Sequence, residues 1–288
     1  MIFFDDRHSS PSSSKSSRWG WLLAATLGVL TGCASLPAPV LNQSSVKTAK
    51  PITVSADGTR ASTTFDVLTF NIEGLGWPAR RARAPSLRKI NTALRGMALR
   101  GKAPDVIMVQ EMFSHAAIST ISDLAYPNMV SGPSRTQRKE LEGAGRMLGS
   151  YKPKKGELGV HIAGSGLAIL SAFPIIETRS EPFGRRRCAG LDCLSNKGML
   201  FARIAIPGVP GTINLFNTHL NSQGASRVSP QRYTRAHHLQ VEELGTFIST
   251  VGSQVIPTVL GGDFNMKGSA IRFERFRNVT EPFEIVHE

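Results

Sequence analysis

Near the end of the chain the sequence reads Gly261-Gly262-Asp263-Phe264-Asn265, directly after a strand-like apolar segment at 257–260. Two polar side chains, Asp263 and Asn265, therefore follow the end of a predicted strand. The stretch alone has a simple structural explanation, because glycine, aspartate and asparagine are common in turns. Its meaning depends on whether other segments place polar side chains at the ends of other strands.

Three other segments do so. Strand ends of neighbouring strands are a natural place to assemble a functional site, because a rigid scaffold fixes the side chains there. We therefore expect the polar residues of all four segments to converge. Asn71 lies in the β-rich segment 65–72, Glu111 follows Val106–Val109 and Gln110, and Asn217 and His219 lie in Phe216-Asn217-Thr218-His219-Leu220.

The hydrophobic pattern predicts more strands than helices, joined mostly by short turns. Such a pattern favours an α+β domain with two packed sheets and helices outside, rather than a strictly alternating parallel sheet. The stretch 131–156 is rich in Gly, Lys and Arg and is predicted to be a mobile loop. Further strands are predicted at 166–171, 199–206 and 212–220, and helices from Pro85, around 114–124 and at 231–250.

From about Thr64 to Asn265 these segments resemble, in order and in local context, the endonuclease/exonuclease/phosphatase superfamily of DNase I-like metallohydrolases. Two further stretches resemble its sphingomyelinase branch: 164–171 followed by Phe173-Pro174-Ile175, and Asn196-Lys197-Gly198. The resemblance implies a four-layer fold, a two-sheet β-sandwich flanked by helices. It also implies metal-dependent hydrolysis of a phosphodiester.

The same resemblance implies roles for individual residues. Glu111 would bind Mg²⁺ or another divalent cation such as Mn²⁺, because a carboxylate suits a hard cation that keeps several waters. Asn71 would contact the metal site or the phosphate. Asp263 would orient or deprotonate the attacking water, Asn265 would hold a phosphate oxygen, and His219 would donate to one. Lys197 and Asn217 would lie at the substrate phosphate, with Asn217 and Asn221 also supporting the strand end.

Members of this superfamily end with a strand followed by an Asp-His pair. After Asn265 the only histidine is His287, which Val286 precedes. We therefore expect a domain at 63–288 that is C-terminally incomplete and lacks its last strands, and the activity of this chain depends on that point.

The N-terminal residues predict export. Lys15 and Arg18 flank a short apolar run at 21–30, and Leu30-Thr31-Gly32-Cys33 resembles a bacterial lipobox. The pattern predicts a signal peptide at 1–33, lipidation of Cys33 and a flexible tether at 34–62, hence a membrane-anchored lipoprotein of the bacterial cell envelope, periplasmic or surface-exposed. A plain secretory signal with an incidental cysteine is the alternative.

Two cysteines remain after Cys33, in the spacing Cys-x4-Cys. Cys188 and Cys193 can form a disulfide in an oxidising compartment, and two free thiols are the alternative.

The net charge of +13, from 34 basic and 21 acidic residues, favours a polyanionic partner, either nucleic acid or an anionic lipid surface. Arginine runs at 80–81 and 185–187 fit such a partner but are equally common in solvated loops. Three functions stay open: a sphingomyelinase C-like phospholipid hydrolase, an exported endonuclease, and a truncated, inactive, membrane-tethered binding protein. No protein partner is inferred.

Overall fold

The computed structural model describes residues 50–76, 81–139, 145–253, 255–281 and 283–284, all within one compact unit, Cys33–Glu288. The predicted signal peptide, Cys33 and the first part of the predicted tether lie outside the described residues, as do Arg80 and His287. Among the described residues, no helix is long and apolar enough to cross a membrane.

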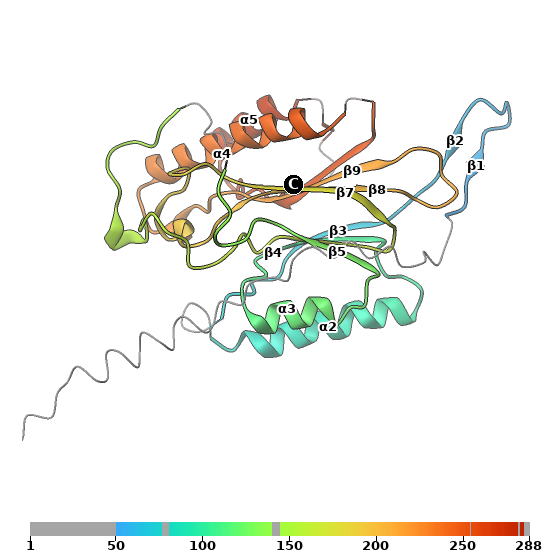
Figure 1. Ribbon diagram of the computed structural model, residues 1–288, viewed down its shortest axis with the longest axis horizontal. Coiled ribbons are helices and arrows are strands. Elements are labelled where there is room, and N and C mark those ends of the chain that lie inside the picture. Colours follow the sequence, from blue (N-terminus) through green and yellow to red (C-terminus); the bar gives the residue numbers. More distant parts are fainter. Residues whose placement is uncertain (1–49, 77–80, 140–144, 254, 282, 285–288) are drawn as a thin grey trace, which may run out of the picture. The chain divides into compact units, whose positions relative to one another are not determined.

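Two four-stranded mixed sheets form the centre of this unit (Figure 1). In each sheet one pair of strands is parallel and the other pairs are antiparallel. The first sheet has the order β3-β4-β6-β5, with β3 Val67–Asn71, β4 Val106–Gln110, β6 Ala168–Ser171 and β5 Asn128–Ser131. The second has the order β10-β9-β8-β7, with β10 Thr258–Asp263, β9 Ile213–His219, β8 Gly198–Ile204 and β7 Ile175–Pro182.

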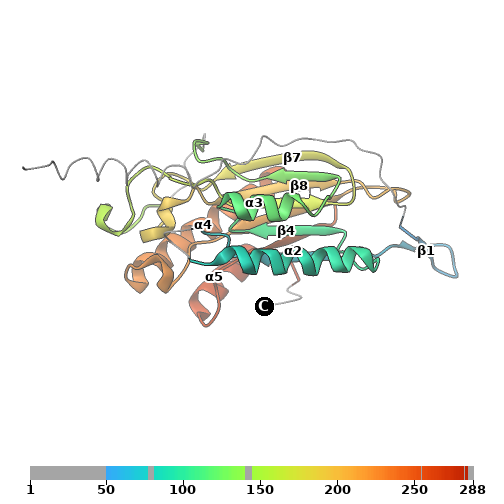
Figure 2. The ribbon, with the colours of Figure 1, turned by 90° about the horizontal axis from the view of Figure 1, so that it is seen from below.

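Helices cover the outer face of each sheet. α2 (Arg83–Leu99) and α3 (His115–Ser122) lie on the first sheet, and Figure 2 shows both helices in front of β4. α4 (Pro230–Val251) and α5 (Ala270–Val279) lie on the second sheet (Figure 1). The predicted α+β class, a two-sheet sandwich flanked by helices in four layers, is therefore confirmed.

Three apolar clusters hold these layers together. The central cluster fills the space between the sheets and includes Met108, Ile169 and Leu200. A second joins the first sheet to α2 and α3 through residues such as Leu87 and Ile121. The third joins the second sheet to α4 and α5 and lies around Phe216, Phe247 and Phe276. Removing this apolar surface from water is the main force that positions the strand ends.

Local sequence explains several boundaries. All five residues of β4 are buried, which explains why its sequence is continuously apolar up to Gln110. α3 begins after Ser114, whose side chain accepts a hydrogen bond from the Ala117 amide at 3.2 Å. α4 begins with Pro230, the position where a missing N–H costs a helix nothing.

Several elements were not predicted. β5, β7 and α5 are additional to the predicted set, and a short hairpin of β1 (Thr53–Val54) and β2 (Ala61–Ser62) lies inside the segment predicted as a tether. In the stretch predicted as a mobile loop, the described residues after β5 hold only a short 3-10 helix, η1 (Pro153–Lys155).

Candidate active site

The ends of four strands meet at one edge of the sandwich. In the first sheet, Asn71 at the end of β3 pairs with Gln110 at the end of β4. In the second, Asp263 at the end of β10 pairs with His219 at the end of β9. Because β3 and β4 face β10 across the sandwich, the predicted convergence of polar side chains forms.

The side-chain amide of Asn71 connects the two sheets at this edge. Its Nδ2 donates to Oε1 of Glu111 at 3.0 Å and to Oδ2 of Asp263 at 2.8 Å. Its Oδ1 accepts from the Glu73 amide at 2.9 Å, which fixes the orientation of the group. A single amide therefore sets the spacing between two carboxylates from different sheets.

Two glycines permit this close approach of strands. A Cβ atom at Gly261 would lie 2.6 Å from Sδ of Met108, in the opposite sheet. A Cβ atom at Gly262 would lie 2.3 Å from the carbonyl oxygen of Thr218, and Gly262 has a φ of +150°. Gly261 therefore lets β10 lie against the first sheet, and Gly262 lets β10 lie close to β9, so that Asp263 is brought to this edge.

Two residues of the site have left-handed backbone conformations. The φ of Glu111 is +61° and that of Asn265 is +51°. Such conformations are costly for residues other than glycine and concentrate at functional sites, where the surrounding structure enforces them. At Glu111 the enforcement is visible, because its carbonyl oxygen accepts hydrogen bonds from the amides of Gly74 and Phe113, at 3.0 and 2.8 Å.

Glu111, His219 and Asp263 offer ligand atoms that lie within 4.8 Å of one another. Burial raises the pKa of Glu111, against the lowering effects of Asn71 and Lys197, and the nearby Asp263 carboxylate raises it further. The two carboxylates at this distance suit a divalent cation, which would relieve the repulsion between them. The donor set therefore fits the predicted metal site, with Asn71 beside it.

Lys197 reaches the same place from the start of β8. Its buried ammonium lies 3.0 Å from Nε2 of His219, donates to the Leu220 carbonyl at 3.1 Å and pairs with Oδ1 of Asp192 at 2.8 Å. Burial and the charge of Lys197 hold the pKa of His219 well below its usual range. An ammonium only donates, so Nε2 of His219 accepts, and the neutral ring carries its proton on Nδ1.

This arrangement differs from the donation predicted for His219. Nε2 also lies 3.5 Å from Oδ2 of Asp263, while Nδ1 is buried without a hydrogen-bond partner among the described residues. Donation from Nε2 to a phosphate oxygen requires that Lys197 releases this nitrogen and that Nε2 then gains a proton. Lys197 and His219 therefore act as a pair, not as two independent groups.

Asn217 does not have the geometry of a phosphate ligand, and that prediction is corrected. Its side chain is buried, and Nδ2 donates to the carbonyls of Val109 and Ala168 at 3.0 and 2.9 Å. Its Oδ1 accepts from Nε2 of Gln110 at 2.7 Å. Both amide hydrogens are used between the two sheets, so Asn217 supports the site by joining β9 to β4 and β6.

Asn265 is also turned toward the protein. Its Nδ2 donates to the Leu220 carbonyl at 3.0 Å, and its backbone amide donates to Oδ1 of Asp263 at 3.1 Å. The predicted contact with a phosphate oxygen would require the side chain to leave Leu220. Asn221 is a supporting residue as predicted, because its Oδ1 accepts from the Ala189 amide at 2.9 Å.

Two further site residues were missed by sequence reasoning. Asp192 holds the ammonium of Lys197 and also accepts from the amide and hydroxyl of Ser222, both at 2.6 Å. Arg272, fully buried in α5, donates from Nη1 to the carbonyls of Asn221 and Asn265 at 2.8 and 2.9 Å. It thereby ties together the turns that follow β9 and β10.

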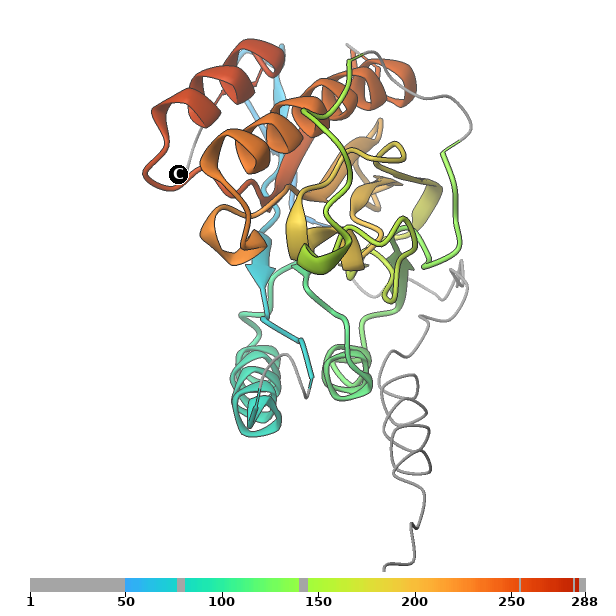
Figure 3. The same cartoon turned by 90° about the vertical axis from the view of Figure 1, so that its left-hand side faces the viewer.

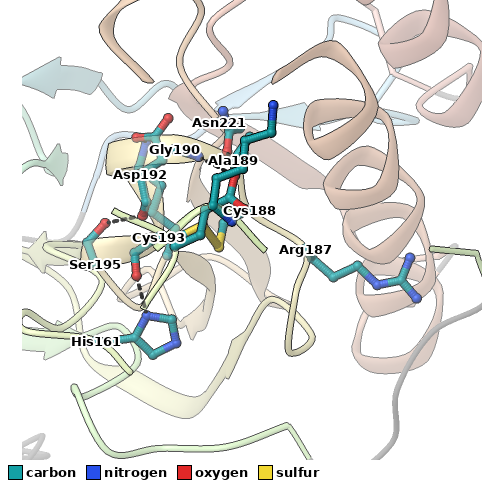
Figure 4. Close-up of a disulfide and its surroundings, with 12 residues drawn as sticks. His161, Arg187, Cys188, Ala189, Gly190, Asp192, Cys193, Ser195 and Asn221 are labelled. Atoms are coloured by element: carbon teal, nitrogen blue, oxygen red, sulfur yellow. Dashed lines mark hydrogen bonds and ion pairs between the residues drawn. A yellow bond between two sulfur atoms is a disulfide. The ribbon is translucent and has the colours of Figure 1, made fainter. Parts of the chain in front are cut away.

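The disulfide predicted between the two remaining cysteines is present. Cys188 and Cys193 form a disulfide that closes a loop leading into the short 3-10 helix η2 (Gly190–Leu194), which carries Asp192 (Figure 4). In the figure Ser195 and His161 bond to this loop, and the loop lies next to Asn221. The disulfide therefore restrains the segment that positions Lys197 through Asp192.

The four-layer sandwich carries two carboxylates and a histidine at one edge, a set of side chains suited to the hydrolysis of phosphate esters. A sequence model of the endonuclease/exonuclease/phosphatase family matches residues 68–281. The chain belongs to this family.

Solved structures share the fold. A β-hairpin deletion mutant of beta toxin from Staphylococcus aureus is 21% identical, with 76% of this chain and 73% of that chain covered and a TM-score of 0.57. A second beta toxin mutant, with bound magnesium ions, is 24% identical (75% and 70% covered, TM-score 0.54). Sphingomyelinase C from Streptomyces griseocarneus is 20% identical (76% and 70% covered, TM-score 0.54). A comparison with curated protein sequences finds no match.

Proposed function

We propose that this protein is a divalent-cation-dependent phosphodiesterase that cleaves phospholipid headgroups, in the manner of a sphingomyelinase C. The observation that carries the proposal is the meeting of Asn71, Glu111, His219 and Asp263 at one edge of the two sheets, with ligand atoms of the last three within 4.8 Å. Mg²⁺, or another divalent cation such as Mn²⁺, would be held by Glu111 and Asp263. When bound, it would draw charge from the phosphate oxygens.

The residues around that position divide the remaining work. Asp263 is partly exposed, and one of its oxygens is held by the Asn265 amide at 3.1 Å, so its carboxylate is oriented and still accessible to water. It can orient an attacking water molecule and accept its proton. Asn71 holds both carboxylates in place. Its contacts mean that the site is largely organised before substrate arrives.

Lys197 supplies a fixed positive charge on the other side of the site. An anionic phosphate group competes with Asp192 and His219 for its ammonium, because all three groups can accept from it. Once Lys197 turns to the phosphate, Nε2 of His219 is released, and after taking up a proton from water it can donate to a phosphate oxygen. This sequence gives the pair a way to stabilise charge that develops during the reaction.

Phospholipid is the preferred substrate class for two reasons. Asn196-Lys197-Gly198 resembles the sphingomyelinase branch, and structures with this fold include a sphingomyelinase C. The predicted lipid anchor at Cys33 would keep the enzyme at a membrane of the bacterial envelope. Nucleic acid, which the net charge of +13 also suits, is the competing substrate.

The test measures hydrolysis by the full chain of sphingomyelin, phosphatidylcholine and double-stranded DNA in parallel, with Mg²⁺ and with a chelator. Asp263→Ala should abolish turnover, and Asp123→Ala, at an exposed position next to α3, should not. We expect Mg²⁺-dependent release of a lipid headgroup. Turnover of DNA alone would replace the substrate, and binding of lipid or DNA without turnover would favour a non-catalytic binding protein.

A further inference from the structure

Exposed apolar side chains gather on one surface of the molecule. Of the eleven large apolar side chains that are exposed among the described residues, five belong to the segment 148–162 and to η2. They are aliphatic and between 36% and 56% exposed: Leu148, Leu158, Val160, Ile162 and Leu191. Exposed apolar side chains scattered singly need no explanation, but a group of this kind indicates a binding surface.

Direct contacts bring the segment 148–162 and η2, which carry these residues, together. A Cβ atom at Gly156 would lie 3.2 Å from Cδ2 of Leu191, so the turn after η1 touches η2. The Ile162 amide donates to the Leu194 carbonyl at 2.8 Å, and Nδ1 of His161 lies 3.0 Å from the Cys193 carbonyl oxygen (Figure 4). Figure 3 shows η1 and η2 beside each other at this end of the sheets.

Buried polar contacts fix the backbone of this segment to α4 and η2. Glu157, in the middle of the segment, is buried and accepts from Nε of Arg232 at 2.7 Å and from the Gly190 amide at 3.0 Å. Arg232 also donates to the carbonyls of Leu148 and Ser150. The polar contacts of the segment thus point toward α4 and η2, while its aliphatic side chains point outward.

Exposed basic residues surround the apolar ones. Lys152, Lys154 and Lys155 lie in and next to η1, and all three are exposed. The only acidic residue between 145 and 163 is Glu157, which is buried. Beside the segment, Arg146, Arg185 and Arg186 line a cavity of about 540 Å³. An aliphatic centre with a basic margin is the composition that binds to an anionic lipid surface.

The surface reaches the candidate active site through one residue. Leu191 is followed by Asp192, whose Oδ1 lies 2.8 Å from the Lys197 ammonium. Lys197 in turn contacts His219. Lipid held against Leu191 would therefore lie close to the residues that act on a phosphodiester.

We propose that the segment 148–162 and Leu191 form a membrane-docking surface, which binds an anionic phospholipid bilayer and presents the candidate active site to it. The proposal rests on the function proposed above. Nucleic acid fits this surface less well, because its exposed apolar side chains are aliphatic and offer no ring on which a base can stack. The nearby ring of Tyr151 is already covered by the Arg186 guanidinium, 4.3 Å from its centroid.

Tryptophan fluorescence tests the docking directly, without requiring hydrolysis. The full chain with Val160→Trp is bound to vesicles of phosphatidylglycerol and phosphatidylcholine that carry brominated acyl chains, and the signal of the unchanged chain is subtracted. The matched control is Ile176→Trp. Ile176 lies on β7 and is 52% exposed. We expect a blue shift and quenching for the tryptophan at 160 but not for the one at 176. Equal quenching at both positions, or none at 160 on vesicle-bound protein, would overturn the proposal.

A second experiment separates docking from chemistry. Val160→Ser combined with Ile162→Ser should lower hydrolysis of vesicle phospholipid about tenfold or more, because two aliphatic contacts with the bilayer are lost. Hydrolysis of a small soluble phosphodiester, bis(p-nitrophenyl) phosphate, should not change, and Ile176→Ser should affect neither rate. Quenching at 160 without any hydrolysis would support docking and reject the enzyme. Equal hydrolysis of vesicle lipid by all variants would reject docking. Docking would also be rejected if the chain forms a dimer that the double variant dissociates, and the tryptophan at 160 is not quenched.

Discussion

The ammonium of Lys197 lies 3.0 Å from Nε2 of His219, and both side chains are buried. Lys197 donates the proton at this contact and Nε2 accepts it. Burial and this neighbouring charge keep His219 neutral. Lys197→Met should raise the pKa of His219, because the like charge is removed, although burial will still hold the pKa below its usual range. A histidine titration followed by NMR measures the shift, with Lys154→Met as the exposed control. An unchanged pKa would show that the contact has no electrostatic effect.

Asn217 is expected to contribute to the stability of the fold and not to contact the substrate. Asn217→Leu removes the side-chain donor of the buried carbonyls of Val109 and Ala168, whereas Nε2 of Gln110 keeps its bonds to Thr69 and Met108. We expect the free energy of unfolding to fall by about 2–6 kcal/mol, since each of the two unsatisfied buried carbonyls costs roughly 1–3 kcal/mol. Urea denaturation measures the change, and exposed Asn278→Leu in α5 should change it little. A loss no larger than that of the control would contradict the structural role.

Arg272 is expected to act as a positioning residue. Arg272→Lys keeps the charge but has one nitrogen in place of the two that bond to Asn221, Asn265 and Ser222, so the turns after β9 and β10 should separate. Cation affinity should fall together with turnover, and Arg272→Met should lower both further. Exposed Arg277→Lys, on the same helix, is the control. If the parent, Arg272→Lys and Arg272→Met bind Mn²⁺ with equal affinity, Arg272 stabilises the fold and does not position the site.

Acid sensitivity should come in part from the Glu157–Arg232 pair. Burial alone would raise the pKa of Glu157, but hydrogen bonds from Arg232 and from the Gly190 and Lys152 amides outweigh it and lower the pKa. A carboxylate with a lowered pKa stabilises the folded chain above its unfolded pKa of about 4.3, and this stabilisation is lost as the pH falls through the folded value. Stability of the unchanged chain should therefore fall on acidification below that range.

The matching variant is Glu157→Gln. At pH 7 it should lower the free energy of unfolding by about 3–5 kcal/mol, because it leaves the buried Arg232 without its anion. The difference from the parent should narrow as the pH falls. Exposed Glu274→Gln, in α5, should follow the parent at every pH. A constant difference across the pH range would contradict the assignment.

The fold could be predicted where the sequence pattern was determined by burial. β4 is apolar throughout because both its faces are covered, and Ser114 marks the start of α3 by capping it. β7 was missed because it is an edge strand that pairs only with β8, and polar residues such as Glu177 and Arg179 alternate along it. α5 was missed because it buries Arg272 together with Phe276 in place of an apolar stripe.

The site divides in the same way. Residues at strand ends, such as Asn71 and Asp263, could be predicted because the end of an apolar run is visible in sequence. Asp192 and Arg272 could not, because neither follows an apolar strand: Asp192 lies in the short helix η2 and Arg272 inside α5. Asn217 lies at the strand end, as predicted. Its role is different because it is buried between the sheets and its hydrogen bonds are made there, which the sequence pattern does not show.

The proposed activity requires that Glu111 and Asp263, brought together from two sheets, hold one divalent cation. Calorimetric titration of the full chain with Mn²⁺ tests it most directly, for the parent, Glu111→Gln, Asp263→Asn and the exposed control Glu274→Gln. We predict one site whose affinity for Mn²⁺ falls at least about tenfold in each of the two site variants and stays unchanged in the control. Equal affinity in all four proteins would contradict it.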